Sequence, residues 1–455
     1  MDMLISVVST VFWGLVTISV LIFIHEGGHF LAARACGIRV TEFFLGMPCR
    51  FNLHTTLRRS GTKIGVTPIL LGGYAAICGM DDLDIPSTPD VLASIHRHGT
   101  VTVEELALEL GIDAEDVQEA CIQLMGWGSI APVFADDDRK RDKYEADTFA
   151  ALPRDAAGNT VYDGRAFDAA HATEEGEAWE PPMGQDAFFE HERSRTYAGV
   201  GFLKRAFMLV AGIAVNVVFG FLLLMSVYSI IGFDVPVDVN RIGSVVEGSP
   251  ADAAGLESGD VVISVNGEQT DSWTALVTAL QAAGDTDPGA TISLDVERDG
   301  SQHTVEIAPD EEGLIGINVP YENFTLNPVD SFFVSADYIY QTVSGVISLL
   351  VPTQTMEVLS SSTSIVGISV MSAQAAASGP AIYLTFAALI SLSVGLMNLL
   401  PIPPLDGGKL VIEVVQAITR RKVPLRIRSI LSYVGVALFM ALFVYMLQQD
   451  ITRFF

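Results

Sequence analysis

Basic residues are scarce in this chain of 455 residues: 26 lysines and arginines stand against 54 aspartates and glutamates, giving a formal net charge of -28. A chain this acidic does not suggest a nucleic-acid-binding protein, because a phosphate backbone is recognised by a basic surface. Most of the acidic excess lies between Asp81 and Glu192, in runs such as residues 136–138. A solvated acidic insertion is the simplest interpretation of this region.

Cysteine is also scarce, and the four cysteines present do not form the close pairs that indicate a zinc module. They are Cys36, Cys49, Cys78 and Cys121. All four lie between the first two hydrophobic runs, in a region that is assigned below to the cytoplasm. Thiols stay reduced in that compartment, so structural thiols rather than disulfides are expected.

Charged residues are absent from several long hydrophobic runs, and half of the chain is hydrophobic. About 20 apolar residues suffice to cross a bilayer. Four uncharged runs are long enough, at residues 4–24, 206–233, about 378–405 and 429–447. The first run lacks the basic n-region and the cleavage site of a signal peptide, so we expect a retained helix. The sequence therefore predicts a multi-pass α-helical membrane protein with four transmembrane helices.

The distribution of basic residues predicts the orientation, because lysines and arginines near spans stay in the cytoplasm. The stretch from Asp234 to Pro380 contains only Arg241 and Arg298. The loops on either side of this stretch carry the remaining basic residues near spans: Arg34, Arg39, Arg50, Arg58, Arg59, Lys63, Lys204 and Arg205, then Lys409, Arg420, Arg421, Lys422, Arg426 and Arg428. Both termini are thus expected outside, and the first and third spans end at the same depth near the cytoplasmic face.

The first span ends in an H-E-x-x-H motif, His25-Glu26-Gly27-Gly28-His29. Histidines four residues apart lie on one face of a helix and can bind the same zinc ion. Glu26 lies about 60° around the helix from His29, where its carboxylate can accept a proton from an attacking water. Ionisable groups at membrane depth are costly and indicate function. The alternative is a pair of interfacial histidines at the point where the helix leaves the membrane.

The third span ends in a second polar motif, residues 398–408, which read NLLPIPPLDGG. Its three prolines break the helix, which is tolerated at this depth only within protein or beside a cavity. The topology places Asp406 level with the two histidines, so it is predicted to be the third protein ligand of the zinc. A helix N-cap is the alternative for Asp406. Asn398 is predicted to hydrogen-bond a substrate, with an interhelical polar contact as its alternative.

Together these two motifs resemble the site-2 protease family of intramembrane zinc metalloproteases, especially the bacterial branch with an extracytoplasmic PDZ domain, the regulator-of-sigma-E protease type. The resemblance covers residues 1–80 and 196–455. It implies Zn2+ as the cofactor, zinc ligation by His25, His29 and Asp406, and Glu26 as the catalytic base. It also implies cleavage of single-span membrane proteins, such as anti-sigma factors or remnant signal peptides, in regulated intramembrane proteolysis within the cell membrane.

Three further segments resemble parts of that family more loosely. Residues 44–48 are similar to its re-entrant loop, although the second glycine of that loop is not clear. Residues 63–80, with Gly72 and Gly73, resemble its membrane-associated β-hairpin, whose edge would hold an unwound substrate by strand addition. Residues 211–216 resemble its A-G-P-x-x-N segment with isoleucine in place of proline. Asn216 there is predicted to contact the substrate, or alternatively to pack between helices.

Residues 240–320 indicate short strands around one helix, and residues 255–267 resemble the recurring core of PDZ domains. Val261, Ile263 and Val265 alternate as a half-buried strand would, and Asn266-Gly267 is typical of a tight turn. PDZ domains bind extended peptides by strand addition. The resemblance implies a filter that restricts substrate access, and a non-binding spacer is the alternative.

The insertion shows three helical segments, at residues 90–98, 102–110 and 113–124, in a pattern that resembles a winged-helix unit. Thr102 and Asp113 are each predicted to cap a helix, with Glu105 and Asp116 three residues further on. Its acidic character and the lack of Lys or Arg in the third helix argue against DNA binding. We therefore expect a protein partner or a structural role. Residues 135–195 are polar and poor in periodicity, so a partly disordered linker is expected.

The predicted protein is a multi-pass helical protease core with an extracytoplasmic α+β PDZ domain and a small, cytoplasmic, winged-helix-like insertion. Its expected parts are residues 1–80 (first transmembrane helix, re-entrant loop and β-hairpin), 81–195 (insertion, with 85–135 winged-helix-like and 136–195 linker), 196–235 (second transmembrane helix), 236–322 (PDZ domain), 323–378 (amphipathic connector), 379–408 (third transmembrane helix) and 409–455 (cytoplasmic loop and fourth transmembrane helix). Two other functions are consistent with parts of the pattern: a non-catalytic, membrane-anchored PDZ scaffold, and a membrane-tethered transcription factor.

Overall fold

The structure is a computed structural model, and it describes residues 2–49, 51–80, 85–134, 143–286, 290–310, 313–349, 351, 353–356 and 362–454. The chain forms two compact units. Unit 1 combines Met1–Leu224 with Val334–Phe455, and unit 2 is Met225–Phe333. The predicted membrane helices and the two polar motifs belong to unit 1, apart from the last residues of the second span.

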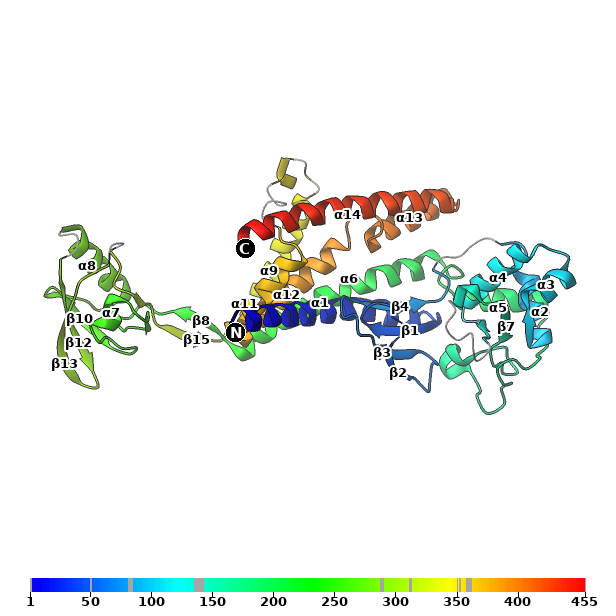
Figure 1. The fold of residues 1–455 in the computed structure, drawn as a ribbon, viewed down its shortest axis with the longest axis horizontal. Helices are drawn as coiled ribbons and strands as arrows, with labels where there is room; N and C mark the ends of the chain where they lie inside the picture. Colours follow the sequence, from blue (N-terminus) through cyan, green and yellow to red (C-terminus); the bar gives the residue numbers. More distant parts are fainter. Residues whose placement is uncertain are drawn as a thin grey trace. The chain divides into compact units, whose positions relative to one another are not determined.

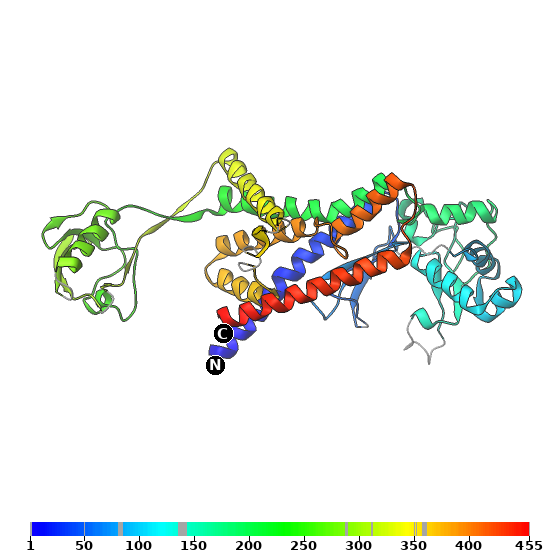
Figure 2. The same cartoon turned by 90° about the horizontal axis from the view of Figure 1, so that it is seen from above.

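Four helices within the described residues are long and apolar enough to cross a membrane, which confirms the number predicted. They are α1 (Asp2–Ala35), α6 (Phe202–Ser226, followed by a π-helical turn at Val227–Ile231), α12 (Pro380–Met397) and α14 (Leu425–Phe454). The beginning of α1 and the end of α14 lie at the same end of the helical bundle (Figures 1 and 2). An even number of membrane crossings requires both chain ends to lie on the same side of the membrane.

The third hydrophobic run is helical only as far as Met397, because the three prolines that follow interrupt the backbone hydrogen-bonding pattern. A short helix, α13 (Asp406–Thr419), begins directly after this irregular segment. The expected amphipathic connector at residues 323–378 contains two helices, α9 (Pro328–Ser348) and α11 (Ile365–Ala377). Helix α11 is apolar all round because it packs against α1, α12 and α14.

A four-stranded sheet packs against the second half of α1 (Figure 1). Its strands are β1 (Val40–Leu45), β2 (Leu53–Thr56), β3 (Lys63–Val66) and β4 (Gly73–Ile77), in the order β2-β3-β1-β4. The expected hairpin over residues 63–80 is therefore wrong in its pairing: β3 and β4 do not pair with each other, because β1 lies between them, parallel to β3 and antiparallel to β4. The segment expected as a re-entrant loop, 44–48, begins as the end of β1.

The insertion forms three helices and a three-stranded sheet of order β5-β7-β6. The helices are α2 (Thr88–His98), α3 (Val103–Leu110) and α4 (Ala114–Gly126), and the strands are β5 (Thr100–Thr102), β6 (Ile130–Pro132) and β7 (Thr148–Ala151). The predicted capping box is confirmed at Thr102, which exchanges hydrogen bonds with Glu105. Asp113 occupies the N-cap position of α4 without a side-chain cap, contrary to the prediction.

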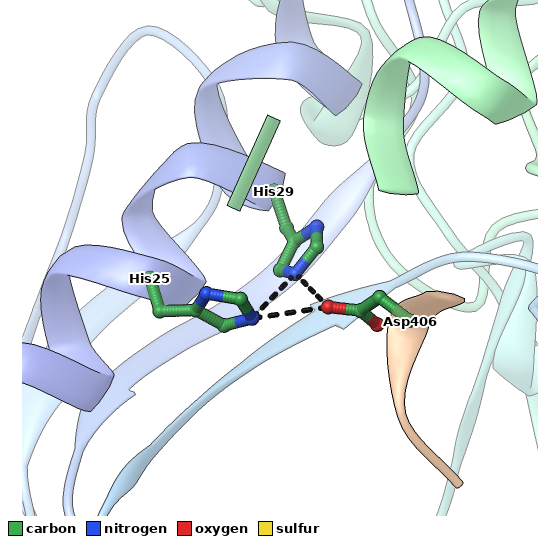
Figure 3. Close-up of side chains that lie close together, drawn as sticks. All are labelled: His25, His29 and Asp406. Atoms are coloured by element: carbon green, nitrogen blue, oxygen red, sulfur yellow. Dashed lines mark hydrogen bonds and ion pairs between the residues drawn. The ribbon is translucent and has the colours of Figure 1, made fainter. Parts of the chain in front are cut away.

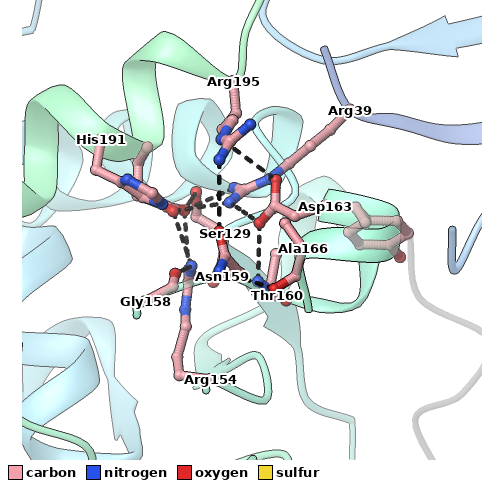
Figure 4. A network of polar contacts seen from close by, with 12 residues as sticks. Arg39, Ser129, Arg154, Gly158, Asn159, Thr160, Asp163, Ala166, His191 and Arg195 are labelled. Atoms are coloured by element: carbon pink, nitrogen blue, oxygen red, sulfur yellow. Dashed lines mark hydrogen bonds and ion pairs between the residues drawn. The ribbon is translucent and has the colours of Figure 1, made fainter. Parts of the chain in front are cut away.

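Residues 143–195 are folded, so the expectation of a disordered linker is wrong for the part of that segment that the structure describes. It contains β7, the 3-10 turns Lys143–Glu145 and Val161–Ala166, and helix α5 (Gln185–Ser194). These elements surround a buried ionic network, shown in Figure 4. Glu192 lies between the guanidinium groups of Arg39 and Arg154, with N–O distances of 2.7–2.9 Å. Asp163 binds the other edge of Arg39 at 2.6 and 2.8 Å.

Unit 2 has a four-stranded antiparallel sheet, β11-β10-β12-β13, and two helices. The sheet strands are β10 (Val261–Val265), β11 (Glu268–Gln269), β12 (Ile292–Arg298) and β13 (Ser301–Ile307), and the helices are α7 (Pro250–Ala253) and α8 (Trp273–Thr286). Two small pairs complete the unit, β9 (Ser244–Val245) with β14 (Ile317–Asn318) and β8 (Phe233–Pro236) with β15 (Tyr321–Phe324).

The tight turn predicted at Asn266-Gly267 is confirmed, since both residues have positive φ and join β10 to β11. The predicted alternation along β10 is wrong in part. Val262 and Val265 face the core of unit 2, whereas Ile263 is only half-buried. The register against β12 shifts between Val262 and Ser264, and this bulge moves the alternation by one residue.

Candidate metal centre

His25 and His29 lie one turn apart on α1, which runs through the H-E-x-x-H motif without a break. Four residues advance a helix by a little more than one turn, so both imidazoles leave the same face. Their Nε2 atoms are 3.2 Å apart, and the rings meet edge to face. Both side chains are buried in unit 1.

Asp406 completes the cluster from the first turn of α13 (Figure 3). Its Oδ2 atom lies 3.0 Å from Nε2 of His25 and 3.0 Å from Nε2 of His29. The backbone N–H of Gly407 donates to the carbonyl of Asn398 at 2.7 Å, which folds the irregular segment back on itself and presents the carboxylate. Among the described residues, these three form the one group of histidine, cysteine or acidic side chains arranged to hold a metal.

The hydrogen bonds of His29 show that the cluster is built for a cation. Nδ1 of His29 is 2.7 Å from the carbonyl oxygen of Met208, and a carbonyl can only accept, so that nitrogen carries the proton. In the neutral ring, Nε2 then presents a lone pair toward the carboxylate of Asp406. A backbone carbonyl that accepts from the other ring nitrogen is usual behind a metal-bound histidine. Nδ1 of His25 is buried without a partner in the described part of the chain.

The spacing of the three donor atoms fits zinc. The distances of 3.0, 3.0 and 3.2 Å are close to the edge of a ligand tetrahedron around zinc, which is about 3.3 Å for nitrogen and oxygen ligands. Two imidazoles and one carboxylate are a donor set that zinc accepts, and three protein ligands leave a fourth position for a reacting molecule.

Two glycines make room for the imidazoles where α1 crosses α6. A Cβ on Gly28 would lie 2.6 Å from the carbonyl oxygen of Ala211 and 2.8 Å from Cα of Gly212. A Cβ on Gly212 would overlap Nε2 of His29 and lie 2.9 Å from Cε1 of His25. Small residues allow helix backbones to approach this closely. The donor cluster thus depends on α6 as well as on the helices that carry the ligands.

Glu26 and Lys409 flank the cluster. Glu26 is half-buried on α1, and its carboxylate makes no hydrogen bond within the described residues. Nζ of Lys409 lies 3.5 Å from Oδ1 of Asp406, the carboxylate oxygen that faces away from the histidines. This contact restrains the orientation of the carboxylate.

The two asparagines predicted to contact substrate do not belong to the donor cluster. Asn216 is fully buried on α6 where it faces α12, and neither atom of its side-chain amide has a partner within the described chain. Its backbone carbonyl accepts from Ser391 at 2.9 Å. Asn398 ends α12 and is half-buried, and its backbone rather than its side chain closes the loop before Asp406.

Gly72 and Gly73 bring strand β4 against α1, next to the histidines. A Cβ on Gly73 would lie 3.4 Å from Cα of Phe23, two residues before His25. Gly72 has a φ of 147° and lies opposite Ile22 and Met47. Both glycines therefore lie at the edge of the sheet beside the motif, at contact distance from α1.

A comparison with known families shows the family to which the chain belongs. The family model described as Peptidase family M50 matches residues 13–442. The chain belongs to peptidase family M50. This M50 protein is a zinc metalloendopeptidase, with Zn2+ as its cofactor, and the predicted membership of the site-2 protease family is confirmed.

Relatives of this M50 protein align along almost its entire length. The zinc metalloprotease RasP of Geobacillus kaustophilus is 27% identical, and the alignment covers 97% of each chain. The regulator of sigma-W protease RasP of Bacillus subtilis is 25% identical, over 98% of this chain and 99% of its own. The protease RseP of Yersinia pestis is 24% identical, and the alignment covers 98% of this chain and 99% of its own.

Sequence reasoning missed three groups at the M50 site: the two crossing glycines, Gly28 and Gly212, and the carbonyl of Met208. The small residues Ala211 and Gly212 within an apolar helix were a signal for a close crossing. Nothing in the sequence indicates which helix crosses there. A backbone carbonyl leaves no signal at all, because every residue has one.

Proposed function

We propose that this M50 protein is an intramembrane endopeptidase in which His25, His29 and Asp406 hold the zinc ion and Glu26 is the general base. The observation that carries the assignment is the convergence of three donor atoms within 3.2 Å of one another, from two segments far apart in the sequence. The irregular segment before Asp406 supports an intramembrane site, since broken backbone at membrane depth is tolerated only inside protein or beside a cavity.

When bound, zinc lowers the pKa of a water and polarises the carbonyl that is attacked. Glu26 accepts a proton from the attacking water and passes it to the leaving amine. It is suited to this role because its carboxylate is half-buried and has no hydrogen-bond partner in the described chain. Met208 fixes the orientation of His29, and Lys409 restrains Asp406. These contacts hold the donor set in place, so it need not rearrange during the reaction.

A transmembrane substrate must unwind before its peptide bonds are accessible, and β4 offers it a partner. β4 is an edge strand of its sheet, and Gly73 sets it against α1 next to His25. An extended substrate segment can add to this edge through main-chain hydrogen bonds. Gly72, Gly73, Asn216 and Asn398 are the residues proposed to contact it.

The substrates proposed are single-span membrane proteins, such as anti-sigma factors or remnant signal peptides. The name of the Bacillus subtilis relative, a regulator of sigma-W protease, favours the first class. The orientation proposed from the basic loops puts both termini outside the cell membrane and the metal centre near the cytoplasmic face. The common end of the bundle for the first and last helices is consistent with both termini lying on one side of the membrane.

Unit 2 is proposed to be a PDZ domain outside the membrane that filters substrates. Its small antiparallel sheet, the tight turn at Asn266-Gly267 and helix α8 support this proposal. The insertion is proposed to be a winged-helix-like domain with a protein partner. The element order supports it, with helices α2, α3 and α4 around a sheet of order β5-β7-β6. Acidic side chains on α4 argue against DNA as the ligand.

The test of the catalytic assignment is Glu26→Gln in the purified full-length protein, with a model transmembrane substrate. We expect cleavage to fall by at least about 100-fold, which is the lower end of what general-base catalysis contributes, while one zinc per chain is retained. His25→Ala is the comparison variant, and it should lose both zinc and activity. Unchanged cleavage by Glu26→Gln would remove Glu26 from the mechanism. Trapping of uncut substrates by the same variant in cells identifies the substrate class.

A further inference from the structure

A cavity of about 570 Å³ lies in unit 1, away from the metal centre, between the membrane-associated sheet and the insertion. One wall is the turn between β2 and β3, and the other is the segment around the 3-10 turn Val161–Ala166. Three arginines line it: Arg58 and Arg59 from the turn, and Arg165 from the insertion. None of its described lining residues is acidic.

All three arginines are exposed, so their guanidinium groups are accessible to a ligand from solution or from a membrane surface. Within the described residues, none of their side chains makes an ion pair or a hydrogen bond. The arginines of the neighbouring network behave differently, because Arg39 and Arg154 are each bound to carboxylates at 2.6–2.9 Å. Three like charges around one cavity repel one another unless an anion lies between them.

The sheet that carries Arg58 and Arg59 has a basic end and an apolar end. At the apolar end, Leu53 pairs with Val66 and Leu45 pairs with Gly73, which packs against Phe23 of α1, two residues before His25. Several large apolar side chains around this end are exposed, and two of them strongly, Phe51 at 77% and Leu53 at 78%; the others are Met47, Ile69 and Leu71. Apolar surface of this kind is stable in contact with lipid rather than with water.

The basic end lies level with the last turn of α1, where the first span ends. Nη1 of Arg34, in that turn, donates to the carbonyl of Tyr162 in the cavity wall at 2.6 Å. Gly61 lies so close to Val161 that an added Cβ would be 3.0 Å from its carbonyl oxygen. The two walls are therefore fixed to each other and to the end of the span. With the apolar end in the hydrocarbon region, the arginines are at the depth of lipid headgroups.

We propose that Arg58, Arg59 and Arg165 form a binding site for the phosphate of an anionic phospholipid. Guanidinium groups recognise phosphate oxygens through paired, charge-assisted hydrogen bonds. The exposed apolar side chains of the same sheet lie beside the acyl chains of the bound lipid. Because Arg165 belongs to the insertion, the lipid joins the insertion to the membrane face of the protease.

The test is native mass spectrometry of the full-length protein in detergent, titrated with phosphatidylglycerol or with phosphatidylcholine. Each basic residue at a membrane surface contributes about fivefold to the affinity for anionic lipid. We therefore expect the variant Arg58→Gln/Arg59→Gln/Arg165→Gln to bind phosphatidylglycerol at least about tenfold more weakly than the wild type, with phosphatidylcholine binding unchanged. The matched control is Arg420→Gln/Arg421→Gln/Arg426→Gln, which removes the same charge from exposed cytoplasmic-loop positions and should retain the wild-type affinity.

Three outcomes would overturn the proposal. Equal losses in the two triple variants would show that phosphatidylglycerol responds to net charge and not to this cavity. Displacement of phosphatidylglycerol by millimolar inorganic phosphate would identify a soluble anion as the ligand. Loss of zinc or of peptidase activity by the cavity variant in lipid-free detergent would show that the arginines hold the fold together rather than a lipid.

Discussion

Gly212 has no side chain that could bind metal or react, yet the metal centre depends strongly on it. The Nε2 atom of His29 occupies the space that a side chain at residue 212 would need. Met208, one turn earlier on the same helix, supplies the carbonyl that fixes the His29 tautomer. Helix α6 therefore sets both the position and the protonation of a ligand that belongs to α1.

Gly212→Ala is expected to lose most of the bound zinc, because the added methyl group forces His29 out of the donor cluster. An affinity loss of about 10–100-fold is the range seen when the surroundings of a metal ligand are disturbed. Metal analysis of the purified protein, together with cleavage of a model substrate, measures the effect. Gly345→Ala is a control in α9, where the added Cβ meets nothing within 4 Å, and it should keep its zinc. Full zinc occupancy in Gly212→Ala would contradict this account of the crossing.

At the scale of elements, a buried ionic network joins the insertion to Arg39, which lies between α1 and β1. Burial alone would raise the pKa of Glu192, but the charges of Arg154 and Arg39 outweigh it and hold that pKa well below its usual range. His96 lies at the edge of the same network. Its Nδ1–H donates to the carbonyl of Leu92 at 2.8 Å, and its Nε2 accepts from Nε of Arg154 at 3.1 Å. The ring is therefore bound in its neutral form.

Acid is expected to destabilise the insertion through His96. Burial, reinforced by the charge of Arg154, lowers the pKa of this histidine from 6.5 to about 3. Below pH 6.5, His96 binds a proton in the unfolded state but not in the folded state. The free energy of unfolding therefore falls by about 1.4 kcal/mol per pH unit until the pH approaches 3. The contribution of Glu192 has the same sign but is lost only below its unfolded value of about 4.5. Between pH 6.5 and 4.5 the slope comes from His96 and, with the same sign, from His191 on α5, whose pKa is also lowered by burial.

The measurement is urea unfolding of the full-length protein at pH 7.0, 6.0 and 5.0, followed by the fluorescence of Trp127 and Trp179 after Trp13 and Trp273 have been replaced by phenylalanine. His96→Gln in the same background is the control, since glutamine retains an acceptor for Arg154 but does not titrate. Its unfolding free energy should change less between pH 7.0 and 5.0. Identical slopes for the two proteins would assign the acid sensitivity to another group.

The sequence predicted those elements whose burial follows a pattern of apolar residues. The four spans, the helices of the insertion and the turn at Asn266-Gly267 all have such local signals. The folded segment 143–195 was missed because its buried groups are ionic: Arg154 and Glu192 look like surface residues until their partners are known. The pairing of the sheet at α1 was missed because β1 inserts between two strands that are neighbours in sequence.

At the metal centre too, residues with a local sequence pattern were predicted and residues without one were missed. The spacing of His25 and His29 is a local pattern, and charge asymmetry placed Asp406 at their depth. The three residues were therefore predicted together, and the structure brings them together. Gly28 and Gly212 were not predicted as parts of the site, because a glycine in an apolar helix does not reveal what approaches it.

At the scale of the whole molecule, the chain enters the main part of unit 2 and leaves it again at neighbouring points. Pro236 and Tyr321 are direct partners in the β8–β15 pair. The three residues of the donor cluster, both crossing glycines and Met208 belong to unit 1. The candidate metal centre is thus contained in one unit, and residues 237–320 of the other unit begin and end beside each other in the chain.

Replacement of residues 237–320 by a two-residue Asn-Gly turn should therefore leave zinc binding intact, because this turn closes an antiparallel pair. We expect one zinc per chain and cleavage of a short model substrate within about threefold of the wild type, since this change is under 1 kcal/mol. Metal analysis and the cleavage assay check both expectations. Loss of zinc from the shortened protein would mean that unit 2 is needed to form the metal centre.

The distance along the chain between the zinc-binding residues has a consequence for biosynthesis. Asp406 follows His25 by 381 residues, so a nascent chain leaving the ribosome carries two histidines long before it carries the carboxylate. Helix α6, which shapes their surroundings, is also made before Asp406. The proposed zinc site therefore cannot be completed until α13 has been synthesised.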